Sequence, residues 1–82
     1  MKINLQITRN GESKTITANA ADMVAFESKY NVSVTSLSSD PKMSYMLYLA
    51  YHAEHRQGET KDKFEDWLND VENVGAGEDN PK

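Results

Sequence analysis

The sequence contains no cysteine and no long apolar segment. Without cysteine, the chain has no disulfide, no thiolate metal ligand and no cysteine nucleophile. No apolar stretch approaches the roughly 20 residues that a membrane-spanning helix requires, and the first residues include no apolar leader segment. We therefore expect a soluble, cytoplasmic protein without a membrane partner. The length of 82 residues corresponds to a single domain.

The residues that form common catalytic and ligand sites are also missing or scattered. The glycines are dispersed, so they form no phosphate-binding loop, and no serine stands in a G-x-S-x-G segment. His52 and His55 share a helix-like spacing but lack the further ligands of a zinc site, so we interpret them as solvated side chains. We expect no catalytic residue, no metal and no cofactor, and hence a protein that is not an enzyme.

Negative charge is concentrated in the last third of the chain. From Glu54 onward there are nine acidic and four basic residues, whereas up to Ala53 there are four acidic and five basic ones. A negative field repels phosphate groups, and no segment clusters Lys and Arg. These features argue against a nucleic-acid partner and favour a protein partner.

The N-terminal segment has the period of a half-buried β-strand. Ile3, Leu5 and Ile7 alternate with polar residues. Asn10-Gly11 follows, a dipeptide that suits the tight turn of a hairpin because both central residues of that turn take positive φ. The sequence therefore predicts a β-hairpin whose second strand covers residues 12–18.

Three helices are predicted after the hairpin. Asn19 is the expected N-cap of a helix that ends near Tyr30, and Asp40-Pro41 opens a second helix that ends at Gly58. Thr60 is the expected cap of a third helix, which reaches residue 74. The polar segment 31–39 favours a loop over a short strand. The predicted fold class is α+β and mainly helical, with one globular domain over residues 1–74 and a flexible acidic tail over 75–82.

The third predicted helix is strongly amphipathic, because apolar residues recur at helical spacing from Phe64 to Val74. Its opposite face is acidic and carries Asp62, Glu65, Asp66 and Asp70. The predicted core combines one face of the hairpin with the apolar faces of the helices. Its members are Ile3, Leu5, Ile7, Ile16, Phe26, Met43, Leu47, Ala50, Phe64, Trp67, Leu68 and Val71.

The second predicted helix carries more apolar residues than one buried face needs. The predicted core-facing arc of this helix contains Met43, Leu47 and the other apolar residues of that side. Outside this arc lie Tyr45, Tyr48 and Leu49. Two interpretations follow. The three residues pack beneath the hairpin or the loop, or they form an exposed patch that binds a client protein or a second copy of the chain.

The three predicted helices resemble those of the small tail assembly chaperones of long-tailed bacteriophages. The resemblance rests on residues 21–27 (ADMVAFE), 48–58 (YLAYHAEHRQG) and 64–71 (FEDWLNDV). They are similar to the "D…FE", "YLAW-A…R.G" and "F…F/W…V" helices of that family. The resemblance covers roughly residues 3–74 and includes no catalytic motif.

The resemblance implies a non-enzymatic role in the cytoplasm of the host cell. Members of that family bind the tape measure protein and keep it soluble while tail tube subunits polymerise around it. They also tend to self-associate, which implies a homo-oligomer, and often occur in a short and a longer frameshifted form. The alternative is a small adaptor or regulatory module of a phage or bacterium that docks through the acidic C-terminal helix.

Overall fold

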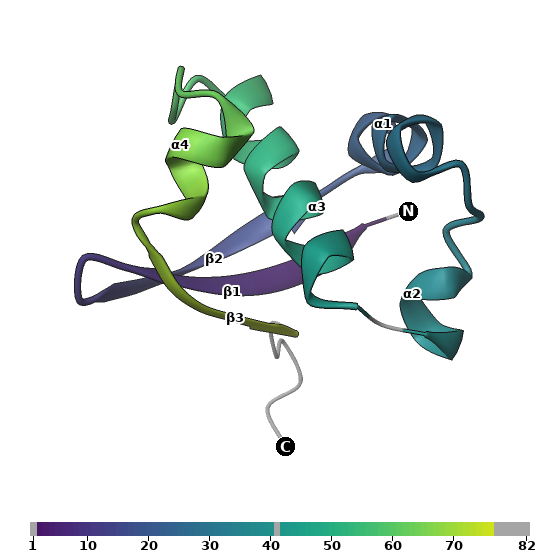
Figure 1. Ribbon diagram of the computed structural model, residues 1–82, viewed down its shortest axis with the longest axis horizontal. Coiled ribbons are helices and arrows are strands. Elements are labelled where there is room, and N and C mark those ends of the chain that lie inside the picture. The colour runs from purple at the N-terminus through teal and green to yellow at the C-terminus, as the bar shows by residue number, and fades with distance from the viewer. Residues whose placement is uncertain (1, 41, 77–82) are drawn as a thin grey trace.

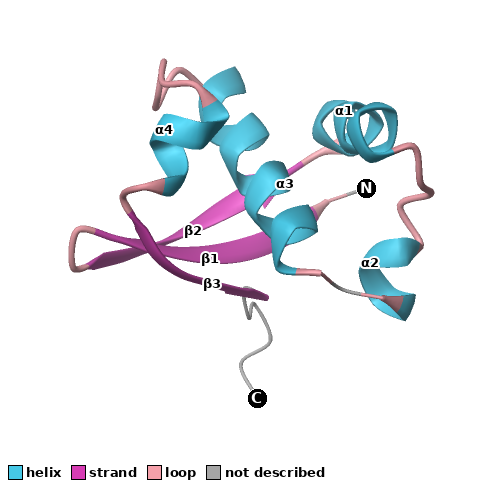
Figure 2. Cartoon of the chain, in the orientation of Figure 1, coloured by secondary structure: helices cyan, strands magenta, loops and turns pink. Residues whose placement is uncertain are grey.

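The computed structural model describes residues 2–40 and 42–76 and contains a three-stranded antiparallel sheet covered by helices (Figure 1). The strand order is β2-β1-β3, so the first strand is central. α1, α3 and α4 lie on one face of the sheet, with α3 running across it (Figure 2). In chain order the elements are β1 (Ile3–Arg9), β2 (Glu12–Ala18), α1 (Ala20–Tyr30), α2 (Ser36–Ser39), α3 (Met43–Arg56), α4 (Phe64–Leu68) and β3 (Val71–Ala76).

The predicted hairpin is present. Asn10 and Gly11 both adopt positive φ, 52° and 81°, as a two-residue turn between twisted strands requires. The flanking residues Arg9 and Glu12 are paired, and the register continues to Ile3 opposite Ala18. Leu5, Ile7 and Ile16 consequently share the face that the helices cover, where all three are buried.

The predicted fold class of a hairpin followed by three helices, mainly helical, is wrong, because the end of the third predicted helix is a strand. α4 ends at Leu68, and β3 pairs with β1. The register places Val74 opposite Ile7 and Val71 opposite Arg9, which leaves Glu72 as an extra residue. Because of this β-bulge, Val71 and Val74 face the same side of the sheet although they are three positions apart. Their spacing in the sequence is therefore the same as that of two residues on one face of a helix.

The helix boundaries follow the predicted signals only in part. The N-cap of α1 is confirmed: Asn19 accepts hydrogen bonds from the N–H groups of Ala21 and Asp22, and Asp22 accepts one from the Asn19 N–H. α3 begins at Met43, later than the predicted start at residues 40–41, and it has no side-chain cap. Thr60 does not cap α4; its hydroxyl accepts the Asp62 N–H in the preceding turn.

The core lies between α1, α3, α4 and the sheet. Most of the predicted hydrophobic core is buried or partly buried, but Met43 is exposed. The buried apolar residues are Leu5, Ile7, Ile16, Ala18, Met23, Phe26, Tyr45, Leu49, Ala50, Ala53, Trp67 and Val74.

Two carboxylates are buried within this core. Asp22 on α1 accepts hydrogen bonds from Arg56 on α3 at 2.9 and 3.1 Å and shares another with His52. Burial by itself raises the pKa of Asp22, but Arg56, the Asn19 N–H and His52 outweigh it, so the pKa lies below its ordinary value. Glu54 is the second buried carboxylate, and it joins α3 to the hairpin and to α4.

The predicted tail of residues 75–82 begins inside the sheet. Gly75 pairs with Gln6, and β3 continues to Ala76. Residues 77–82, the rest of that predicted tail, lie outside the described residues. Over the described part of the chain, no helix combines the length and the apolar character needed to cross a membrane.

Candidate protein-binding surface

The buried face of α3 differs from the predicted one by a rotation about the helix axis. Tyr45 and Leu49, two of the three residues of the predicted binding patch, are only 8% and 0% exposed. Met43, which was predicted to be core, is 55% exposed, and Leu47 is half-buried. The prediction of an exposed patch at Tyr45 and Leu49 is therefore wrong, and the interpretation of these residues as core is the one the structure supports.

The packing of α1 against α3 explains why the buried face of α3 is rotated from the predicted one. The rings of Phe26 and Tyr30 on α1 pack against Tyr45, each with its centroid 5.0 Å from that of Tyr45. Edge-on aromatic contacts of this kind stabilise a pair beyond the area it buries. α3 is thus packed by α1 on one side and by the sheet below, and its remaining apolar side turns towards β3.

Tyr48, the third residue of the predicted patch, is half-buried between α1 and α4. Its ring contacts Tyr30 at 5.8 Å and Phe64 at 5.4 Å between centroids, and the ammonium of Lys29 lies 5.4 Å from its centroid. These contacts fill the space between the helices. Tyr48 therefore joins elements of the domain, and only part of its ring faces outward.

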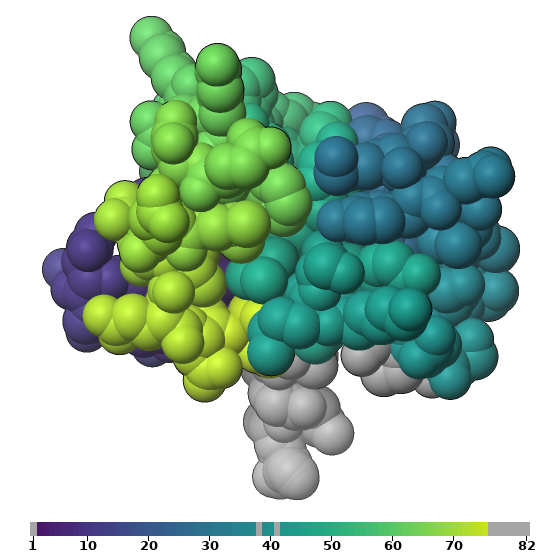
Figure 3. Space-filling model, in the orientation of Figure 1, coloured from purple at the N-terminus to yellow at the C-terminus, as the bar shows by residue number. Residues whose placement is uncertain are grey.

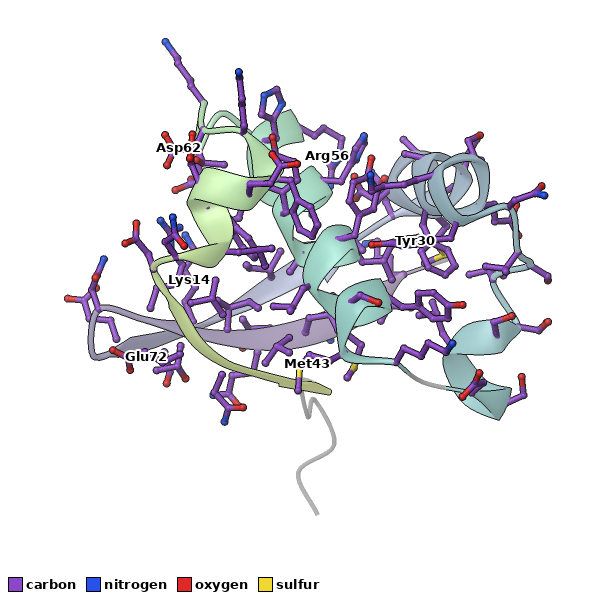
Figure 4. All side chains as sticks on the ribbon, in the orientation of Figure 1. Lys14, Tyr30, Met43, Arg56, Asp62 and Glu72 are labelled. Atoms are coloured by element: carbon purple, nitrogen blue, oxygen red, sulfur yellow. The ribbon has the colours of Figure 1, made fainter. Side chains whose placement is uncertain are left out.

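An apolar groove of about 220 Å³ lies on the other side of α3, where this helix meets β3. We refer to it as the α3–β3 groove. Figure 3 shows the side chains of the two elements meeting on this side, and in Figure 4 Met43 of α3 lies near the end of β3, whereas Glu72 lies near the beginning of that strand. The groove is lined by Met43, Leu47, Leu68, Val71, Glu72, Asn73 and Val74.

The outer edge of β3 forms one border of this groove. Arg9 and Glu12 flank the two-residue turn and therefore form a hydrogen-bonded pair. Such pairs alternate along antiparallel strands, so Ile7, two residues before Arg9, also directs its backbone N–H and C=O towards β2. Val74, the partner of Ile7 on β3, therefore directs its N–H away from the sheet. The side chain of Asn73 accepts this N–H at 2.9 Å. Together with the bulge at Glu72, this bond obstructs the edge.

The four residues of the predicted acidic face are all exposed, but they do not lie on one long helix. Asp62 precedes α4, Glu65 and Asp66 occupy its first turn, and Asp70 follows it. Carboxylates in a first turn interact favourably with the helix dipole. Asp70 also lies 3.7 Å from an Arg9 nitrogen in an exposed ion pair.

The histidine and acidic side chains of the described residues are not clustered in a way that could hold a metal ion. No group of three or more potential metal ligands is present among them. His52 is not the solvated side chain that was expected, since it bonds Asp22, while His55 is exposed. A second hollow of about 230 Å³ near the hairpin turn is lined in part by Arg9, Lys14 and Glu54, and both cations form ion pairs with Glu54.

Sequence reasoning missed the groove because it assigned the wrong side of α3 to the core. Charge gives no signal of the correct side, because Glu54, which continues the series of Leu47 and Ala50, is itself buried. No family model, curated protein or solved structure matches this chain.

Proposed function

We propose that this chain is a non-enzymatic assembly chaperone of the bacteriophage tail that binds the tape measure protein and keeps it soluble during tail morphogenesis. The observation that carries the proposal is the exposure of Met43, 55%, at a groove that is already formed and largely apolar. Exposed apolar surface with a defined shape is typical of protein-binding sites. We expect this binding to take place in the cytoplasm of the infected host cell.

The chemistry of the groove suits a client that is not a single defined ligand. Methionine is flexible and polarizable, so a surface that contains it adapts to different apolar side chains. Leu47 and Leu68 provide further aliphatic contact. A chaperone that has to bind successive segments of a long client benefits from such tolerance.

The exposed acidic residues support the solubilising part of this function. Asp62, Glu65 and Asp66 project into solvent around α4, and the whole chain carries a net charge of −4. A complex covered by such chains repels its neighbours, which opposes aggregation.

The alternative, a small adaptor or regulatory module, was based on docking through a long acidic C-terminal helix. α4 has five residues, and its acidic neighbours are spread over the flanking turns. The observation that motivated the adaptor is therefore weaker than the groove, and we favour the chaperone.

Co-expression tests the proposal. The chain is produced together with the tape measure protein of a long-tailed bacteriophage, and the soluble fraction of this client is measured. We expect the wild type to raise that fraction and Met43→Asp to abolish the gain. Met43 is the first residue of α3, where a carboxylate complements the helix dipole, so this variant is expected to fold.

Val24→Asp provides the matched control, since Val24 is 61% exposed on α1, outside the groove. It introduces the same charge at an equally exposed apolar residue and should leave the solubilisation intact. Failure of the wild type to solubilise the client would overturn the proposed function. A fixed-stoichiometry complex with a folded protein instead would indicate the adaptor.

A further inference from the structure

We infer that the α3–β3 groove recognises an amphipathic α-helix of the client that carries aliphatic side chains with Lys or Arg beside them. This inference rests on the proposed function and specifies the kind of segment that is bound. It follows from three features of the groove: its obstructed strand edge, its volume and its charge.

The border formed by β3 disfavours an extended segment. A peptide that adds a strand to a sheet needs free backbone N–H and C=O groups along the edge. Here the outward N–H of Val74 is bonded to the Asn73 side chain, and the bulge at Glu72 breaks the regular spacing. A helix satisfies its own backbone groups and needs none from the edge, so it is the secondary structure that fits this border.

The volume of the groove restricts what enters it. Sites for small molecules and cofactors usually enclose about 300–1,000 Å³, and this groove encloses about 220 Å³. That space suits one or two aliphatic side chains. A helix offers them from one face at positions i, i+3 and i+4, and Met43 and Leu47 present a complementary i, i+4 pair on α3.

The charge at the groove selects basic flanking residues. Among the described residues that line it, only Glu72 is charged, and its side chain is exposed. Asp70 is exposed as well, but it already pairs with Arg9. Lys or Arg next to the apolar anchors of the client would therefore pair with Glu72. A second copy of this chain would bring the same acidic surface, so electrostatic repulsion disfavours it as the occupant.

The test uses three synthetic helical peptides and the full chain. The first peptide carries Leu at i, i+3, i+4 and i+7 on an Ala-Gln background with flanking Lys. The second has Glu in place of Lys, and the third keeps Lys but has Gln in place of Leu. Fluorescence anisotropy measures binding, and circular dichroism measures the helicity gained. We expect the first peptide to bind about fivefold or more tightly than the second, and the third not to bind.

Two variants locate the effect. Glu72→Lys should reverse the preference between the Lys and Glu peptides, because it inverts the charge at the groove. Met43→Asp should weaken binding of the first peptide, whereas Val24→Asp should not. Equal binding of the Lys and Glu peptides, or a bound peptide that is extended, would overturn the inference. If that happens while the client is still solubilised in a Met43-dependent way, the proposed function stands. Binding of the first peptide without any solubilisation of the client would overturn the proposed function alone.

Discussion

The indole N–H of Trp67 donates a hydrogen bond to a carboxylate oxygen of Glu54 at 2.9 Å, and both side chains are almost completely buried. The same oxygen lies 3.0 Å from an Arg9 nitrogen, and the other carboxylate oxygen lies 3.1 Å from Lys14. Hydrogen bonding to Glu54 also raises the pKa of Lys14. One side chain of α3 thus holds α4 and both strands of the hairpin in place.

The Trp67–Glu54 bond predicts a measurable coupling. Trp67→Phe removes the donor and should lower the free energy of unfolding by about 1–3 kcal/mol, whereas Trp67→Ala should lower it by about 3–5 kcal/mol. Urea unfolding followed by circular dichroism provides these values. Combined with Glu54→Leu, which removes the acceptor, the Trp67→Phe effect should be non-additive by about 0.5–3 kcal/mol. Additive effects would mean that the two residues contribute independently.

The buried Asp22 predicts a loss of stability in acid. Its pKa is lowered in the folded state, so its contribution is complete above the pKa of the unfolded chain, about 3.9, and is lost as the pH falls through the folded value. The free energy of unfolding, measured by denaturant titration from pH 7 to pH 2, should therefore decrease at the acidic end.

Asp22→Asn tests the origin of that decrease. Because the substitution leaves Arg56 and His52 without their carboxylate, it should lower the free energy of unfolding at pH 7 by about 3 kcal/mol. It should also flatten the pH dependence below pH 5. An unchanged acid profile in the variant would assign the decrease to other carboxylates.

The orientation of α3 predicts opposite sensitivities for Tyr45 and Met43. Tyr45→Ala removes a ring packed against Phe26 and Tyr30 and should lower the free energy of unfolding by about 3 kcal/mol. Met43→Ser alters an exposed side chain and should change it by about 0.5 kcal/mol or less. Thermal unfolding of the two variants distinguishes them. A larger loss of stability in Met43→Ser than in Tyr45→Ala would mean that Tyr45 is exposed and Met43 is buried, which would contradict the α3–β3 groove.

The hydrogen bond from the Val74 N–H to the Asn73 side chain is expected to protect the edge of β3 from pairing with another strand. Asn73→Ala frees the outward N–H of Val74 and should promote pairing between the β3 edges of two molecules. Sedimentation velocity over a range of concentrations measures this association. Asn69→Ala, which changes an exposed asparagine in the turn after α4, is the control. If both variants sediment like the wild type, the Asn73 side chain does not guard the edge.

Local signals predicted the first part of the fold and failed at its end. The Asn10-Gly11 turn and the Asn19 cap act through their own backbone neighbours, so the sequence identifies them directly. The bulge at Glu72 depends on pairing with β1, and the spacing of Val71 and Val74 does not reveal it. The β-branched valines and the helix-disfavouring Asn69-Asp70 were weak evidence for a strand.

The candidate site was harder to predict than the fold, because it depends on which side of α3 its neighbours cover. Tyr45 and Met43 are both apolar and only two positions apart in the sequence. The packing of α1 buries the first and leaves the second exposed. The exposure of the acidic residues around α4 was predicted from the sequence because carboxylates are usually exposed, although Asp22 and Glu54 in the same chain are buried.

The pairing of β3 with β1 joins segments from nearly opposite ends of the chain. Contacts of such high sequence separation require the closure of a long loop and form late in folding. The hairpin and α1 are local and can form early, but one wall of the α3–β3 groove is supplied by the last strand. During synthesis the α3–β3 groove therefore forms only after β3 has been made, and a chain without β3 has no such groove.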